Sequence, residues 1–208
     1  TRYIDDDLNR SFPGDKTADS HEKRLAARLS NLLSGCETLS LHSTQSYGDT
    51  FAIVTSPGEF EREVVPRLSV DTIVDASAFD EGRLFETISR TIELECGYQG
   101  TQQATTNGFR AAREFLGAVG ALSQARRSRQ PALPVFRLTE RIPKDAGDSY
   151  AVSASNFEYV AEGKAFAAID DRDIVAEGGF YPVLLSAEGY EDVFGYAATR
   201  LGTVDDVL

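Results

Sequence analysis

The chain opens with Thr1-Arg-Tyr-Ile-Asp-Asp-Asp-Leu-Asn-Arg-Ser-Phe-Pro-Gly14, a stretch that is dense in charged and amide side chains. It contains Arg2, Asn9 and Arg10 but too few apolar residues for a helix or strand of the core. We therefore expect a loop that holds polar groups for chemistry. The aspartates at 5–7 resemble a metal cluster, although a solvated acidic run is the more common arrangement.

Helical and strand-like patterns alternate along the first 125 residues. We expect helices at 17–34, 60–68, 81–90 and 107–121, and strands at 37–42, 51–55, 71–76 and 91–95. This alternation is typical of an α/β domain in which helices cover a mostly parallel or mixed sheet. Residues 1–125 are therefore predicted to form one such domain. In the last helix we expect one buried face with Phe109, Ala112, Phe115, Leu116 and Val119.

The helical period disappears after a basic, proline-containing stretch at 124–134, which resembles a linker. Short β-like runs separated by Gly, Asp and Asn turns follow at 135–139, 149–154, 164–169, 173–176 and 180–185. We therefore expect a small β-rich domain over residues 131–208.

The chain carries a formal charge of -12, from 33 acidic and 21 basic residues. Such a surface repels phosphate backbones and anionic lipid, so nucleic acids and membranes are not expected as partners. No apolar run approaches the ~18 to 20 residues that span a bilayer and no export signal is recognised, so we expect a cytoplasmic protein. The scarcity of lysine beside abundant acid favours a protein adapted to high salt, and homo-oligomer formation is left open.

Two polar residues, His42 and Glu95, stand at the carboxyl ends of predicted strands, where function collects in an open parallel sheet. A histidine there can bind a metal through one ring nitrogen, and a glutamate in a partly dry cleft can act as a general base. Position alone leaves two structural roles open, a core histidine and a helix-capping carboxylate. His21, at a helix start, is expected at the surface. Cys36 and Cys96 lack metal-ligand spacing and are expected to be buried free thiols.

Four segments, in this order, resemble the aspartoacylase and succinylglutamate desuccinylase family of zinc-dependent deacylases. Residues 1–12 are similar to the family signature, and Leu41-His-Ser-Thr44 is similar to the segment that carries its third zinc ligand. Leu94-Glu-Cys-Gly97 resembles the segment of the catalytic glutamate. Phe180-Tyr-Pro182, followed by Gly189-Tyr190, resembles the C-terminal region that supplies a substrate-binding tyrosine.

The resemblance implies a zinc carboxypeptidase-like fold and hydrolysis of the amide bond of a small N-acyl amino acid with Zn²⁺ as cofactor. It implies that His42 is a zinc ligand. It also implies that Glu95 activates the attacking water and later protonates the leaving amine, and that Arg2 polarises the scissile carbonyl. Amide hydrolysis needs these three functions, a Lewis acid, a base and a cation beside the developing oxyanion.

The resemblance further implies three substrate-binding residues. Asn9 and Arg10 would bind a carboxylate of the substrate, for which the planar guanidinium of arginine is well suited. Tyr190 would contact the substrate from the β-rich domain.

The sequence departs from the family pattern in two places. Two further zinc ligands are expected on a His-x-x-Glu segment, which would precede Thr1. An aspartate that supports the zinc-binding imidazole is expected two residues before His42, where this chain has Ser40. A second hypothesis is therefore a truncated or degenerate family member without catalysis, which acts as a ligand-binding or assembly module. A peptidase of the same fold is less favoured, because the β-rich domain would crowd an extended peptide.

Overall fold

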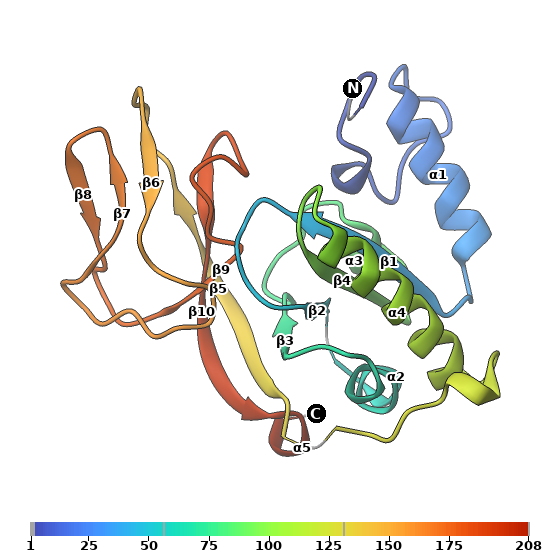
Figure 1. Ribbon diagram of the computed structural model, residues 1–208. Helices are drawn as coiled ribbons and strands as arrows, with labels where there is room; N and C mark the ends of the chain where they lie inside the picture. Colours follow the sequence, from blue (N-terminus) through green and yellow to red (C-terminus); the bar gives the residue numbers. More distant parts are fainter. Residues whose placement is uncertain (1–2, 56, 131, 208) are drawn as a thin grey trace.

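A single mixed sheet of seven strands organises the molecule (Figure 1). The structure is a computed structural model that describes residues 3–55, 57–130 and 132–207. The strand order is β1-β4-β2-β3-β5-β10-β9. The pairs β1/β4, β2/β3 and β3/β5 are parallel, and the other three pairs are antiparallel. The strands are β1 (Thr38–Thr44), β2 (Phe51–Val54), β3 (Thr72–Asp75), β4 (Thr91–Tyr98), β5 (Pro134–Pro143), β9 (Tyr181–Val183) and β10 (Val193–Thr203).

Helices flank this sheet, so the predicted α/β fold with a mixed sheet is confirmed. The α-helices are α1 (His21–Leu33), α2 (Glu59–Val64), α3 (Leu84–Thr87), α4 (Gln102–Ala118) and α5 (Val204–Val207). The 3-10 helices are η1 (Leu8–Arg10), η2 (Val65–Arg67) and η3 (Ser123–Ala125). The predicted helix at 81–90 is wrong over most of its length, because the backbone is already extended at Ile88 and leads into β4.

The two faces of the sheet bury two apolar clusters, as the alternation along β2 illustrates. Ala52 and Val54 belong to a cluster with Phe115 of α4, whereas Phe51 and Ile53 belong to a cluster on the opposite face. All four side chains of β2 are buried. The first face is covered by α2 and α4, and the second face carries the candidate site.

The face that helix α4 turns to the core agrees only in part with the prediction, since Phe115 is buried as expected. Its N-cap is Thr101, whose hydroxyl oxygen accepts the Ala104 N–H at 3.1 Å, so the helix begins earlier than expected. Phe109 is 73% exposed and Leu116 is 43% exposed, so their predicted burial is wrong. Small side chains allow α4 to lie close to the sheet, and the buried apolar residues of this face are Ala104, Ala111, Phe115 and Ala118.

The C-terminal part contributes to two sheets. Strands β5, β9 and β10 extend the main sheet, and β10 was not expected from the sequence. A separate three-stranded sheet consists of β6 (Tyr150–Val152), β7 (Ala165–Ile169) and β8 (Arg172–Val175). It packs on Ile142 of β5 and Phe194 of β10, which belong to the same buried cluster as Phe166 and Ile169. The predicted division into domains stays a prediction.

Three further expectations concern isolated features. Across the residues that the structure describes, none of the helices is long and apolar enough to span a bilayer. His21 is exposed, as expected. Both cysteines are free, but only Cys96 is buried, and burial raises its pKa to about 11. The expected burial of Cys36 is wrong, because this residue lies in the exposed turn after α1.

Reciprocal carboxylate contacts anchor the opening loop on α1. Glu22 of α1 accepts the backbone N–H groups of Ile4 at 2.7 Å and of Asp5 and Asp6 at 3.1 Å each. Asp5 in turn accepts the N–H of His21, the first residue of α1, at 2.7 Å. Hydrogen bonds to the ionised form, above all that from Ile4, lower the pKa of Glu22 to about 2. Part of the acidic run is therefore built into the loop.

Replacing Glu22 with Gln should destabilise the protein at neutral pH, because an amide offers one acceptor oxygen where the carboxylate offers two. The pKa of Glu22 is lower in the folded chain than its usual 4.5. Its contribution to stability is therefore complete above about pH 5 and lost as the pH falls towards about 2. The difference in free energy of unfolding between wild type and Glu22→Gln should shrink over that range in urea titrations. A constant difference, or an equal one for exposed Glu59→Gln, would contradict the role of Glu22.

Candidate metal and catalytic site

Two neighbouring parallel strands, β1 and β4, place four polar side chains on one face of the sheet. Their register pairs Ser40 with Glu93 and His42 with Glu95. Residues two apart in a strand point to the same face, so the four side chains form a square on the face that α4 does not cover. The structure thus brings together His42 and Glu95, which the sequence placed at the ends of two strands.

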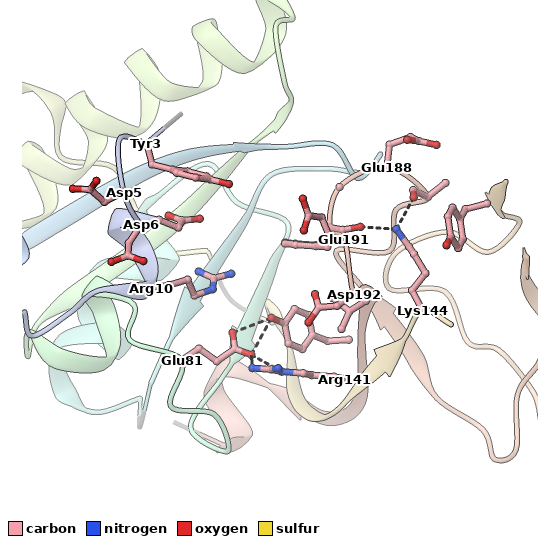
Figure 2. Close-up of a pocket in the computed structure, with 17 residues that line it drawn as sticks. Tyr3, Asp5, Asp6, Arg10, Glu81, Arg141, Lys144, Glu188, Glu191 and Asp192 are labelled. Carbon is pink, nitrogen blue, oxygen red and sulfur yellow. Dashed lines mark hydrogen bonds and ion pairs between the residues drawn. The ribbon is translucent and has the colours of Figure 1, made fainter. Parts of the chain in front are cut away.

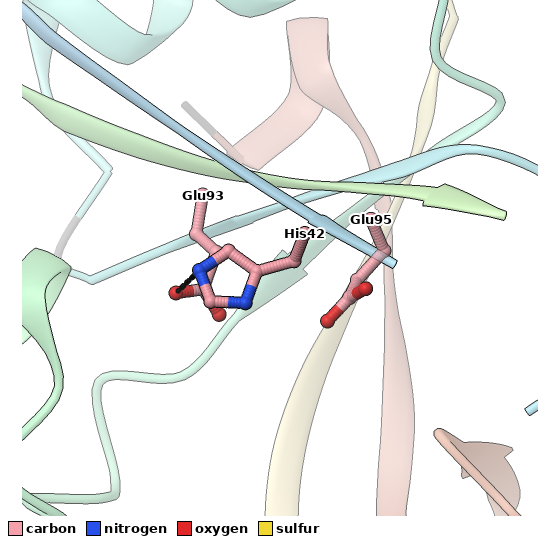
Figure 3. Close-up of side chains that lie close together, drawn as sticks. All are labelled: His42, Glu93 and Glu95. Carbon is pink, nitrogen blue, oxygen red and sulfur yellow. Dashed lines mark ion pairs between the residues drawn. The ribbon is translucent and has the colours of Figure 1, made fainter. Parts of the chain in front are cut away.

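One ring nitrogen of His42 contacts two side-chain oxygen atoms. Its Nε2 is 2.9 Å from Ser40 Oγ and 3.2 Å from Glu93 Oε2. In the view of Figure 3 the ring lies between the carboxylates of Glu93 and Glu95. One ligand atom from each of these three residues lies within 4.8 Å of the other two. Imidazole and carboxylate are thereby concentrated in a small volume.

This set of donors suits a zinc ion in chemical type. Zinc binds imidazole nitrogen and carboxylate oxygen at about 2.0–2.2 Å, so tetrahedral ligand atoms lie about 3.4 Å apart. The candidate ligand atoms of His42, Glu93 and Glu95 lie within 4.8 Å of one another, so rotation of the side chains can bring them to this spacing. Glu93 and Glu95 are buried, at 2% and 6% exposure, and a bound cation would offset the cost of burying two carboxylates.

The opening loop reaches this site through Asn9. The Asn9 Nδ2 group donates to Glu93 Oε2 at 3.1 Å, and Asn9 Oδ1 accepts the Leu84 N–H at 3.1 Å. Both ends of the amide are therefore engaged within the protein. The predicted contact between Asn9 and a substrate carboxylate stays a prediction.

A small inner cavity of about 70 Å³ adjoins the polar square. Arg10, His42, Glu95 and Tyr190 are among the residues that line it. The Arg10 guanidinium donates to the Asn9 carbonyl oxygen at 2.7 Å and remains exposed. Burial, followed by the charge of Glu95, raises the pKa of Tyr190, which keeps its hydroxyl protonated and able to donate. Arg2, the predicted carbonyl-polarising residue, lies outside the described residues.

A larger cleft of about 1140 Å³ shares Arg10, Gly189 and Tyr190 with the inner cavity. Figure 2 shows the opening loop on one side of the cleft and the segment 187–192 on the other. Lys144 holds that segment, because its ammonium group donates to the carbonyl oxygens of Ala187 at 2.8 Å and Tyr190 at 2.5 Å. The position of Tyr190 therefore depends on a cation that also packs on aromatic rings.

A buried charge network forms the floor between the two cavities. Tyr196 accepts a hydrogen bond from Arg83 at 2.5 Å and donates to Glu81 at 2.9 Å. Glu81 also accepts from Arg83 and from Arg141, the latter shown in Figure 2. Burial alone would raise the pKa of Glu81, but the charge of Arg83 and these hydrogen bonds outweigh it and lower the pKa. The network ties the segment that precedes α3, with Glu81 and Arg83, to Arg141 of β5 and Tyr196 of β10.

Sequence reasoning missed two residues of this site, Glu93 and Arg83. The signal for Glu93 was present, because Ile92, Leu94 and Cys96 are apolar and the residues between them are glutamates. A period of two places Glu93 on the same face as Glu95. Arg83 carried no such signal, since it precedes a helix of four residues and reaches the site only through the tertiary fold.

Comparison with known proteins identifies the fold. No model of a known protein family and no curated protein sequence matches the chain. Its structure is similar to that of murine aminoacylase 3, with a TM-score of 0.75 and 18% identity over 97% of this chain and 79% of that chain. It is also similar to succinylglutamate desuccinylase/aspartoacylase from Rhodobacter sphaeroides, with a TM-score of 0.71 and 14% identity over 97% and 70% of the two chains. For succinylglutamate desuccinylase from Vibrio cholerae the TM-score is 0.65, at 14% identity over 96% and 66%. The chain therefore has the fold of the aspartoacylase and succinylglutamate desuccinylase family.

Proposed function

We propose that the protein is a zinc-dependent deacylase that hydrolyses the amide bond of a small N-acyl amino acid. The observation that carries this proposal is the pairing of His42 with Glu95 on adjacent parallel strands, where both residues line the small inner cavity. The fold is shared with deacylases, and His42 offers an imidazole nitrogen, a ligand type that zinc binds, beside buried carboxylates. A cytoplasmic location stays a prediction.

In this proposal His42 holds the metal through Nδ1, because its Nε2 is already occupied by Ser40 and Glu93. When bound, zinc would supply Lewis-acid polarisation of the scissile carbonyl and lower the pKa of a water molecule. The remaining ligands implied by the resemblance, on a His-x-x-Glu segment, do not occur in the 208 residues of this sequence.

Glu95 is the proposed general base. It is 6% exposed and lines the inner cavity, so its carboxylate acts where little water competes. It would take a proton from the attacking water and return it to the nitrogen of the leaving amine. The protonated hydroxyl of Tyr190 and the guanidinium of Arg10 line the same cavity, and they would bind and orient the substrate. As the resemblance implies, Arg2 is proposed to polarise the scissile carbonyl and Asn9 to contact a carboxylate of the substrate.

Zinc should stabilise the wild-type protein, and His42→Ala should abolish this stabilisation. Binding to the folded state at 100 times Kd contributes about 2.7 kcal/mol, which raises Tm by roughly 5–10 °C in a domain of this size. Thermal unfolding with and without zinc measures the shift, and a chelator should reverse it. His21→Ala is a matched control, since His21 is exposed and is the only other histidine. An equal zinc shift in His42→Ala would contradict the role of His42.

Glu95→Gln should lower kcat for the hydrolysis of N-acetylaspartate and related N-acyl amino acids by about 100-fold or more, as expected for loss of a general base. Zinc binding should persist in this variant, because the proposed ligand is unchanged. The control is Glu162→Gln, which neutralises an exposed glutamate outside both cavities. Unchanged kcat in Glu95→Gln would remove its catalytic role. Absence of activity in wild type that binds zinc would favour the alternative, a family member that binds a ligand without catalysis.

A further inference from the structure

We propose that Glu93 is a positioning residue that orients the imidazole of His42 from the neighbouring strand and presents Nδ1 to the metal. This inference deepens the proposed function and rests on it for the metal. Glu93 was not singled out by the sequence or by the family resemblance. It lies opposite Ser40 in the register of β1 and β4, one side-chain layer behind the pair formed by His42 and Glu95.

The contacts at His42 Nε2 decide which ring nitrogen carries the proton. An ionised carboxylate only accepts hydrogen bonds, so Glu93 Oε2 at 3.2 Å requires a proton on Nε2. Ser40 Oγ, at 2.9 Å, can accept from the same N–H. The neutral ring then has its lone pair on Nδ1, which is the form that binds a metal. Glu93 thus selects one tautomer, whereas a serine hydroxyl alone could serve either.

Glu93 is itself held rigidly enough to perform this role. It is 2% exposed, and its Oε2 accepts the Nδ2 group of Asn9 at 3.1 Å. The Asn9 amide cannot reverse without loss, because its Oδ1 accepts the Leu84 N–H at 3.1 Å. A chain of hydrogen bonds therefore runs from the backbone of Leu84, the first residue of α3, through Asn9 and Glu93 to His42.

The same contacts argue against Glu93 as a ligand. Its Oε2 lies against the protonated nitrogen of His42, and that nitrogen cannot bind a metal at the same time. A group that hydrogen-bonds a metal-binding histidine on its far side orients the ring and raises its basicity, and loss of such a group costs about 10–100-fold in metal affinity.

The test compares Glu93→Ala with the double variant Glu93→Ala/Ser40→Asp. Position 40 is within hydrogen-bond distance of Nε2, so an aspartate there supplies a carboxylate from the histidine's own strand. Zinc affinity, measured by competition with a chromophoric chelator, should fall about 10–100-fold in Glu93→Ala and recover in the double variant. Glu61→Ala, which removes another buried glutamate outside the site, should leave it unchanged.

A second readout needs no metal. Nitrogen-15 NMR of the imidazoles at about pH 8.5 should show the Nε2–H tautomer for His42, and the chain has only one other histidine to assign. Glu93→Ala should give a mixture of tautomers, and the double variant should restore the Nε2–H form. An unchanged tautomer in Glu93→Ala would overturn the proposal. A restored tautomer with unrestored zinc affinity would also overturn it and would identify Glu93 as a ligand. Failure of wild type to bind zinc would instead count against the proposed function, with the tautomer still reporting on Glu93.

Discussion

The parallel register of β1 with β4 is the constraint on which the site depends. Because side chains alternate between the faces of a sheet, a slip of one residue would turn His42 or Glu95 towards α4 and separate them. The slip would also bury glutamates in an apolar cluster and expose Ile92 and Leu94, both of which are fully buried. The free energy of core packing therefore fixes the geometry of the polar groups, although none of them belongs to the core.

Polar contacts add to the burial of Phe12 in fixing the opening loop. Glu22 and Asp5 tie it to α1, and Asn9 ties it to Glu93 of β4. Close approach to the segment before α3 also requires a glycine, since Gly82 has φ of +72° and a Cβ there would lie 2.7 Å from the Arg10 carbonyl oxygen. Hydrogen bonds in a partly buried setting hold such a loop more specifically than apolar contacts would, because each donor has few alternative acceptors.

The sequence was sufficient for features that depend on local pattern. Strand ends and motif similarity located His42 and Glu95, and alternation predicted the mixed α/β sheet. Prediction from the sequence failed for features that depend on contacts between residues distant in the chain. The α4 face was misjudged because small residues pack against β4 and the large Phe109 stays exposed. Strand β10 was missed because its register against β5 shifts at several points. Glu93 was missed because the prediction considered only Glu95, the last residue of the predicted strand at 91–95. The period of two that places Glu93 on the same face was not used.

The lining of the larger cleft carries more negative than positive charge. Its lining includes seven carboxylates, from residues 5–7, Glu81, Glu188, Glu191 and Asp192, and three basic residues, Arg10, Arg141 and Lys144. Arg141 is paired with Glu81, which also pairs with Arg83, and Lys144 donates to backbone carbonyl oxygens. An anionic molecule therefore diffuses inward against a repulsive field until it comes close to Arg10, whereas a cation is attracted from the start. Dissolved salt weakens both effects beyond about 8–10 Å, so ionic strength controls how fast each kind of molecule reaches the interior.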